Sequence, residues 1–271
     1  MQPAGENTIK RLTKIGDRKY QTRYGEFLVE GIRAVEEAFR AGAGVCDLIV
    51  RKGDERVGRI ATLIDKAEEL SVNAWIVSLS EMDKICRTTN SQGIAAGVKV
   101  PSKSIGDLFG EMLQIKSGTI LFMDAIQDPG NVGTLIRTAE AFGIEAAVLG
   151  PGSAGLYNPK TIRSTMGAIF RVSAAEMNDR SAHDTVARFK KAGFRIIASN
   201  ISERAVPIER LAPHAKNLLI VGSEASGISP ELLQIADIEV YIPMTGPTES
   251  LNASIAGGIL MFEIGKLGYR L

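Results

Sequence analysis

The sequence has few residues of the kinds that build disulfide or zinc centres, and it has no long apolar run. Cys46 and Cys86 are the two cysteines among 271 residues, and there are two histidines, all scattered. This scarcity excludes a disulfide framework and nearly excludes a conventional His/Cys zinc site. No apolar run reaches the roughly 18 residues needed to span a bilayer, and residues 1–14 lack the apolar core of a secretory signal. We therefore expect a cytoplasmic protein without such a zinc site.

Net charge is also nearly absent, with 32 Lys and Arg against 31 Asp and Glu, but the charges are unevenly distributed. Residues 1–25 carry a net charge of +4, which leaves −3 for the remainder. The basic side chains there are Lys10, Arg11, Lys14, Arg18, Lys19 and Arg23, and Arg33 follows shortly after. A basic arm on a slightly acidic body can contact the phosphates of a nucleic acid. An ordinary solvated helix face explains the same charges.

Length and hydrophobic pattern predict two α/β domains. At about 150 residues per domain the chain is long enough for two. In the first part, apolar runs over 27–31, 46–51, 73–78 and 94–100 indicate strands, and amphipathic segments over 31–42 and 56–70 indicate helices. Residues 101–107 contain Pro, Gly and Ser, as linkers do. We expect domains over 1–100 and 117–271, joined by a linker over 101–116.

The second domain alternates strands and helices more cleanly. Continuous apolar runs of this kind are typical of parallel strands that are covered on both faces. Strands are predicted over 119–126, 145–150, 169–174, 194–199, 217–222 and 238–243, with a helix over 132–143 and a long final helix over 250–268. The fold class is therefore α/β with a parallel sheet.

Three loops in this domain combine glycine with small polar residues. Ligands of parallel α/β sheets bind at the carboxyl ends of the strands, and each loop follows a predicted strand. The first loop is a turn over 128–131, in which Asn131 can cap a helix that also carries Arg137. The second loop runs from Gly222 to Gly227 and contains Glu224. The third loop leads through 243–249 to Ser250-Leu251-Asn252 at the start of the final helix. Each can equally be a plain connector with helix-capping residues.

One nucleotide-binding pattern is misleading. Residues 150–155 match GxGxxG after a predicted strand, but in a dinucleotide site the third glycine must open a helix. Here Pro159 follows, and we expect the next helix to begin near Lys160. A nicotinamide enzyme is therefore a weak alternative, and the P-loop pattern is absent from the sequence.

Taken together, the three loops resemble a known family. DPGNVGTLIRTAEAFG (128–143), VGSEASGIS (221–229) and IPMTGPTESLNASIAGGILMFE (242–263) are similar in order and spacing to the three motifs of the SpoU/TrmH branch of the SPOUT methyltransferases. NPKTIRSTMGAIFRVS (158–173) resembles the segment that connects motifs one and two. GEFLVEGIRAVEEAFRAG (25–42) and SQGIAA (91–96) resemble the small RNA-binding domain of many members, which has a ribosomal-protein-like α/β fold.

The resemblance implies an RNA ribose 2′-O-methyltransferase that uses S-adenosylmethionine and needs no metal. It implies a parallel sheet with a C-terminal trefoil knot, and a homodimer with the final helix at the interface. By matched position, the catalytic residues would be Asn131, Arg137, Glu224, Ser250 and Asn252, and the cofactor-binding residues Gly222, Gly227, Ile242, Met244 and Leu251.

The chemistry of these residue types leaves two roles open for Arg137. The family resemblance makes it the group that handles the proton of the 2′-hydroxyl, whereas a guanidinium pKa above 12 favours binding of phosphate and stabilisation of the developing alkoxide. The preferred substrate is 23S rRNA, because the N-terminal domain resembles those of rRNA-modifying members. A tRNA methyltransferase and a non-catalytic RNA-binding assembly protein are the alternatives.

Overall fold

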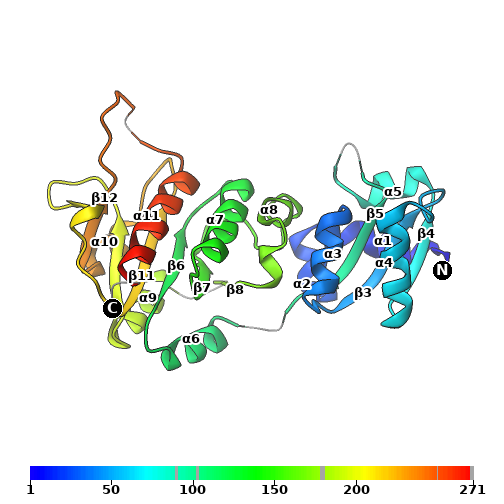
Figure 1. The fold of residues 1–271 in the computed structure, drawn as a ribbon, viewed down its shortest axis with the longest axis horizontal. Helices are drawn as coiled ribbons and strands as arrows, with labels where there is room; N and C mark the ends of the chain where they lie inside the picture. Colours follow the sequence, from blue (N-terminus) through cyan, green and yellow to red (C-terminus); the bar gives the residue numbers. More distant parts are fainter. Residues whose placement is uncertain (89–90, 102–103, 178–180, 249, 269–271) are drawn as a thin grey trace. The chain divides into compact units, whose positions relative to one another are not determined.

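The protein divides into two compact units. The computed structural model describes residues 1–88, 91–101, 104–177, 181–248 and 250–268. One unit consists of residues 1–102 and 157–171, and the other of residues 103–156 and 172–271 (Figure 1). Among the described residues, no helix has both the length and the apolar character that crossing a membrane requires.

The first unit is built on a five-stranded mixed sheet in the order β1-β4-β3-β5-β2. Strands β1, β4 and β3 are parallel, whereas β5 is antiparallel to both of its neighbours, β3 and β2. The elements are β1 (Gln2–Pro3), α1 (Glu6–Lys14), α2 (Arg18–Tyr24), β2 (Glu26–Glu30), α3 (Ile32–Arg40), β3 (Val45–Arg51), α4 (Gly58–Glu69), β4 (Asn73–Val77), α5 (Leu79–Ile85), β5 (Ile94–Lys99), α8 (Pro159–Thr165) and the 3₁₀ turn η1 (Ala168–Phe170).

Helices cover both faces of this sheet. On one face, Leu48 of β3 packs in a core with residues of α3 and α4, such as Val35 and Leu63. On the other face, Ile49 of β3 packs with residues of α1 and α5. Neighbouring strand residues thus enter opposite cores, which explains why the strands read as continuous apolar runs rather than alternating ones.

Residues 6–24 form no free arm, although the charge pattern allowed one. They form α1 and α2, and Leu12 and Ile15 are completely buried in the core beneath α5. The spacing of Leu12 and Ile15 places both on one helix face, so the basic side chains occupy the opposite, solvated side. The positive charge of the N-terminus is therefore part of a folded domain.

The segment 157–171 belongs to the first unit, although its sequence lies between two strands of the second. Ile162 of α8 is buried in the core with β2, and the rings of Tyr157 and Phe27 lie 4.5 Å apart. Arg163 of α8 forms an ion pair of 3.2 Å with Glu30 at the end of β2. This packing was not predicted from the sequence.

The second unit contains a seven-stranded, all-parallel sheet in the order β10-β12-β9-β11-β6-β7-β8. The α/β fold with a parallel sheet is therefore confirmed. Its elements are α6 (Ile105–Gln114), β6 (Gly118–Asp124), α7 (Pro129–Ala141), β7 (Ala146–Leu149), β8 (Ser173–Glu176), α9 (Ala182–Lys191), β9 (Arg195–Ser199), β10 (Val206–Pro207), the 3₁₀ turn η2 (Ile208–Arg210), β11 (Lys216–Gly222), α10 (Pro230–Ile235), β12 (Ile238–Tyr241) and α11 (Ala253–Gly268).

Side chains of α6, α9 and α10 pack on one face of this sheet, around Phe122 and Ile220. Helices α7 and α11 pack against each other beside β6 and β11 (Figure 1). Leu260 and Met261 of α11 are completely buried. Because both faces are covered, the exposed carboxyl ends of the strands are left for ligands.

Two local expectations differ from the structure. Helix α6 occupies most of the expected linker, because a Ser104–Asp107 capping box starts a helix whose Leu108 and Met112 face the core. Residues 102 and 103 of that linker lie outside the described residues. The strand expected over 169–174 begins only at Ser173, because residues 168–170 form η1.

Candidate active site

The first sequence motif begins where β6 ends, at Asp124. Asp128 caps α7 by accepting a hydrogen bond from the Asn131 N–H (3.0 Å), and Pro129 occupies the first turn. Asn131, which the sequence suggested as the cap, is therefore inside the helix. Its side chain is free to reach the second motif, where its Nδ2 donates to Glu224 Oε1 at 2.6 Å.

The second motif is a tight loop after β11. A Cβ on Gly222 would lie 2.3–2.5 Å from the backbone of Gly227 and Ile228, so only glycine fits there. The Ser223 and Ser226 hydroxyls are 2.8 Å apart within the loop. After the loop, the Ser229 N–H donates to the buried Asp124 carboxylate at 2.7 Å, which fastens the second motif to the end of β6.

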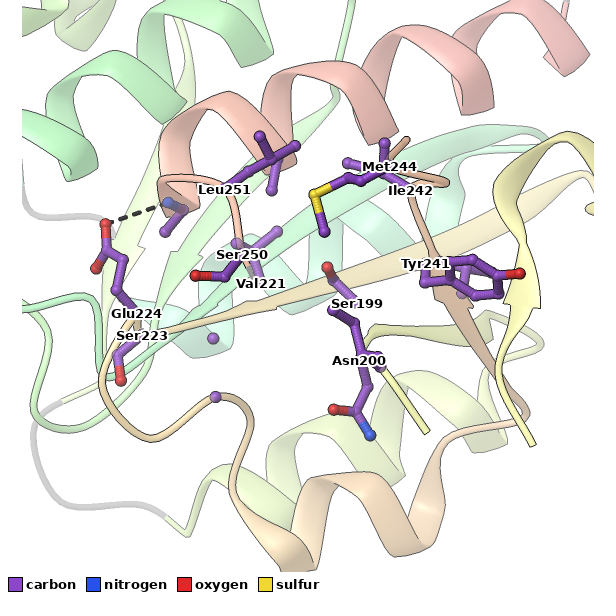
Figure 2. A pocket seen from close by; sticks show the side chains of 16 residues that line it. Ser199, Asn200, Val221, Ser223, Glu224, Tyr241, Ile242, Met244, Ser250 and Leu251 are labelled. Carbon is purple, nitrogen blue, oxygen red and sulfur yellow. Dashed lines mark hydrogen bonds between the residues drawn. The ribbon is translucent and has the colours of Figure 1, made fainter. Parts of the chain in front are cut away.

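The third motif leads into α11. Asn252 precedes the helix, and its Oδ1 accepts from the N–H groups of Ser254 (3.0 Å) and Ile255 (3.3 Å). Its Nδ2 lies 3.1 Å from both Asn131 Oδ1 and Glu224 Oε1. The Ala253 N–H also donates to Glu224 Oε1 at 3.1 Å (Figure 2). The Glu224 carboxylate thus joins the beginnings of α7 and α11 to the β11 loop.

A pocket opens beside this cluster, at the carboxyl ends of β9, β11 and β12. It includes all five residues expected to bind the cofactor, which are Gly222, Gly227, Ile242, Met244 and Leu251. Figure 2 shows the terminal methyl group of Met244 directed toward the Ser199 hydroxyl, with Ser250 between these two side chains and Glu224. The lining is largely apolar, with a few hydroxyls and one carboxylate.

Of the five expected catalytic residues, the structure brings four to this place. Asn131, Glu224 and Asn252 are mutually hydrogen-bonded, and Ser250 lines the pocket. Arg137 does not line the pocket. It is exposed on α7, six residues or about 9 Å along the helix from Asn131. Its guanidinium makes no hydrogen bond or ion pair with the residues that the structure describes.

The sequence analysis missed the wall of the pocket after β9. Ser199 and Asn200 line it, and the buried Glu239 of β12 holds this segment by accepting from Asn200 Nδ2 (2.8 Å) and Ser202 Oγ (2.7 Å). Burial raises the pKa of Glu239, but these hydrogen bonds and Arg204 outweigh burial and leave the pKa below its usual value. A Ser-Asn pair at the carboxyl end of a predicted strand was the available signal.

The basic residues expected to contact RNA lie in the first unit, and all but one are exposed. Lys10, Lys14, Arg18, Lys19, Arg23 and Arg33 are exposed. Arg11 instead pairs with Glu26 and, at 2.7 Å, with Asp47. Burial lowers the pKa of Arg11, but its carboxylate partners raise it more, so the net shift is upward. The charge of Arg11 is therefore offset within the domain.

Aromatic rings of α2 accompany exposed cations of α1 and α2. Tyr20 and Tyr24 have ring centroids 6.2 Å apart. The ammonium of Lys14 lies 5.1 Å from the centre of the Tyr20 ring, and the Arg23 guanidinium lies 5.8 Å from that of Tyr24. Interleaved cations and aromatics are the surface chemistry that binds single-stranded nucleic acid.

The pocket of the second unit fits an adenosyl cofactor. Gly222 has no side chain, so a ligand can approach the backbone of this loop closely. Ile242, Met244 and Leu251 offer apolar contact for a base. Ser199 and Ser250 supply hydroxyls that can bond to a ribose. Within the described residues, no cluster of three or more His, Cys, Asp or Glu side chains is arranged to hold a metal ion.

Comparisons with known protein families match both parts of the chain. Residues 118–262 match the SpoU rRNA Methylase family, and residues 6–96 match the MRM3-like substrate binding domain. A protein of Bacillus subtilis named 23S rRNA (guanosine(2553)-2′-O)-methyltransferase RlmP is 31% identical over 264 residues, covering 97% of this chain and 98% of its own.

Solved structures share the fold over nearly the whole chain. An AdoMet-bound rRNA methyltransferase from Sinorhizobium meliloti superimposes with a TM-score of 0.84 at 23% identity, covering 98% of this chain and 97% of its own. A TrmH-family protein from Porphyromonas gingivalis does so with a TM-score of 0.78 at 28% identity, covering 96% and 98%. The two-unit architecture is thus shared with proteins of this type.

Proposed function

The chain belongs to the SpoU rRNA methylase family, and from this membership and the geometry of the pocket we propose that it transfers a methyl group from S-adenosylmethionine to a ribose 2′-hydroxyl of 23S rRNA. The observation that carries the proposal is the hydrogen-bonded set of Asn131, Glu224 and Asn252, which we call the Glu224 cluster. It joins the three family motifs beside a pocket that contains all five expected cofactor-binding residues. The relative named as a 23S rRNA methyltransferase, aligned over both units, supports rRNA as the substrate.

The residues of this chain bind and align the reactants. S-adenosylmethionine, when bound, supplies a methyl group on a sulfonium sulfur. The pocket residues that would hold it are Gly222, Gly227, Ile242, Met244 and Leu251. Much of the rate then comes from alignment of the ribose hydroxyl with that methyl group. Asn131, Glu224 and Asn252 fix the loops that provide this alignment, because each side chain is hydrogen-bonded to another motif.

Arg137 acts as the charge-stabilising residue. A guanidinium stays protonated at neutral pH, so it suits an RNA phosphate and the negative charge that develops on the ribose oxygen. Its position fits this role only if it acts outside its own pocket, because it is exposed and does not line that pocket.

A second copy of the chain supplies the missing arginine. The exposed face of α11 is apolar, with Ile255 53% and Phe262 47% exposed, and the Phe262 ring lies 5.5 Å from that of Phe142. Exposed apolar patches of this kind mark association surfaces. Arg137 is exposed on α7, the helix that packs against α11 and is followed by Phe142, so a dimer through this face would place Arg137 near the interface. We propose a homodimer in which each Arg137 serves the partner's pocket.

Mixed dimers test the enzyme and the dimer together. R137A and E224A chains are each expected to lose methyl transfer from tritiated S-adenosylmethionine to an unmodified 23S rRNA transcript, and R137A is expected to keep its cofactor affinity. Mixed dimers of the two variants contain one intact composite site and should regain about half of the wild-type rate per dimer. Methylated product should appear as alkali-resistant dinucleotides.

Four results would contradict these proposals in different ways. If the wild-type protein methylates no RNA, the proposed activity is wrong. If mixed dimers stay inactive while wild type is active, Arg137 serves its own pocket. Near-normal turnover by R137A removes Arg137 from the mechanism, and a monomer at micromolar concentration in sedimentation removes the dimer.

A further inference from the structure

A second pocket lies in the first unit, apart from the three motifs. It has a volume of about 310 Å³ and lies where the end of β2, the start of α3, the segment before β5 and α8 meet. Nine of its eleven lining residues lie within the region that matches the substrate binding domain, and Arg163 and Met166 come from α8 and the residue after it. The cofactor pocket shares no residue with it.

Part of the lining of this pocket, which we call its floor, is apolar, and the one carboxylate of the lining, Glu30, is paired with Arg163. Ala34, Ile94 and Met166 line it, together with the buried thiol of Cys86. Burial and the nearby Glu30 raise the pKa of Cys86 to about 12, so the thiol is neutral at physiological pH. A thioether and small apolar side chains suit the flat face of an aromatic ring. They do not suit a bare phosphate, which needs donors on every side.

The rim is cationic and polar. Arg33 is exposed at the start of α3, and Arg163 lines the pocket from α8. Thr88, Ser91 and Gln92 add hydroxyl and amide groups, and the buried Ser91 Oγ has no hydrogen-bond partner among the described residues. Guanidinium planes and small polar groups of this kind stack on unpaired bases and bond to their edges.

The pocket is already organised without a ligand. The Glu30 side chain is only 3% exposed, and its two oxygens accept from the Arg87 N–H (3.0 Å) and from Arg163 Nη1 (3.2 Å). Gln92 Oε1 accepts from the Ile32 N–H at 2.8 Å. These contacts fix Arg163 and the loop wall before binding, which reduces the entropy that a ligand must lose to bind.

We propose that this pocket binds one unstacked nucleotide of the RNA substrate, with its base on the apolar floor and its phosphate at Arg33. The volume is at the lower end of small-molecule pockets and suits one base, whereas a paired helix is too wide to enter. This inference rests on the proposed function for the nature of the ligand. It adds a site at which the substrate binding unit reads a single-stranded position of RNA.

Two substitutions separate the base from the phosphate. A34F fills the pocket floor, and it should weaken binding of an unmodified 23S rRNA transcript about tenfold without changing the salt dependence of the affinity. R33Q removes a rim cation, and it should weaken binding and reduce the salt slope by about one. R40Q, on the same helix but outside the pocket, is the matched control and should stay within about twofold of wild type.

Filter binding is the readout, because it is independent of methyl transfer. Unchanged affinity of A34F, with wild-type thermal unfolding, overturns the proposal, and so does an effect of R33Q that is no larger than that of R40Q. If A34F misfolds, A34L provides the same test with a smaller side chain. A wild-type protein that binds the transcript but does not methylate it contradicts the proposed function and leaves the pocket test intact.

Discussion

One carboxylate links the three motifs of the catalytic unit. Glu224 Oε1 accepts from Asn131, from Asn252 and from the Ala253 N–H, at 2.6–3.1 Å. Removing a shared acceptor leaves several donors without partners at once, which costs more than the loss of one ordinary hydrogen bond. Glu224 therefore holds the loops of the three motifs together beside the pocket.

A substitution at Gly222 tests whether the tight loop after β11 is needed to form the cofactor pocket. G222A should lower cofactor affinity by at least about tenfold, because its Cβ would lie 2.3 Å from the Gly227 backbone and force the loop open. Calorimetry with S-adenosylmethionine measures this. G246A is the control, since a Cβ there meets nothing within 4 Å. Equal affinities for the two variants would show that the loop tolerates opening.

The Glu239 carboxylate, which holds the pocket wall, makes the free energy of unfolding depend on pH. Its folded pKa lies below the ordinary value of 4.5, so its ionised form stabilises the fold above that value, and the stabilisation is lost as pH falls through the lowered folded pKa. E239Q should lower the free energy of unfolding by about 1 kcal/mol at neutral pH. Urea titrations should show the difference shrinking below about pH 4. A difference that persists undiminished in acid would contradict this.

At the residue scale, sequence patterns predicted the types of group better than their partners. Asn131 was interpreted as a possible helix cap, because Asn is a good cap at a helix start. Asp128 takes that role, and Asn131 reaches Glu224, 93 positions away. No local pattern contains that pairing. The resemblance to a family identified the residues, and only the fold shows which of them meet.

At the scale of elements, the contact between α7 and α11 supports the pocket and the exposed apolar face of α11. Gly257 permits this contact, because a Cβ there would lie 2.4 Å from Leu135 Cδ2 and 3.4 Å from Val221. Leu135 is completely buried in the same layer, so it has little room to move. Small residues in α11 are thus required on its inner side, and sequence alone does not distinguish that side from the outer one.

Two neighbouring glycines test this asymmetry. G257V should destabilise the protein by about 1–3 kcal/mol through overpacking. G258A should be neutral or stabilising by up to about 1 kcal/mol, because its nearest neighbour is at 3.5 Å and alanine favours the helix. Thermal unfolding at matched concentrations measures both. The packing argument fails if G258A is as damaging as G257V.

Strands and most helices were predictable from periodicity, whereas packing partners of short segments were not. Most strands of both units were predicted correctly, because continuous apolar runs are typical of sheets covered on both sides, but the strand expected over 169–174 begins only at Ser173. Helix α6 was missed because its Pro, Gly and Ser neighbours resemble a linker. Helix α8 was predicted near its observed start, but Ile162 packs with β2 of the other sheet, a contact that spans more than 130 residues.

At the scale of the whole molecule, the near-zero net charge is the sum of a basic N-terminal segment and a slightly acidic remainder. The N-terminal cations lie on α1 and α2 of the unit that matches a substrate binding domain, and the pocket with the three motifs lies in the other unit. Splitting the charge by position located the basic segment in the sequence, as either an arm or a solvated helix face. Its location on packed helices, rather than on a free arm, required the buried Leu12 and Ile15.

Because of this packing, truncation is not a suitable test of the basic surface. Deleting residues 1–25 would strip β1, α1 and α2 from the sheet and expose the core under α5, so we expect the truncated unit to unfold. A K14Q/K19Q/R23Q triple variant keeps the fold, because all three side chains are exposed. Each lost phosphate contact reduces the salt slope by about 0.7–0.9. RNA affinity should therefore fall and the slope should decrease by about two, while S-adenosylmethionine affinity stays at the wild-type value. An unchanged slope would make these cations an ordinary solvated face.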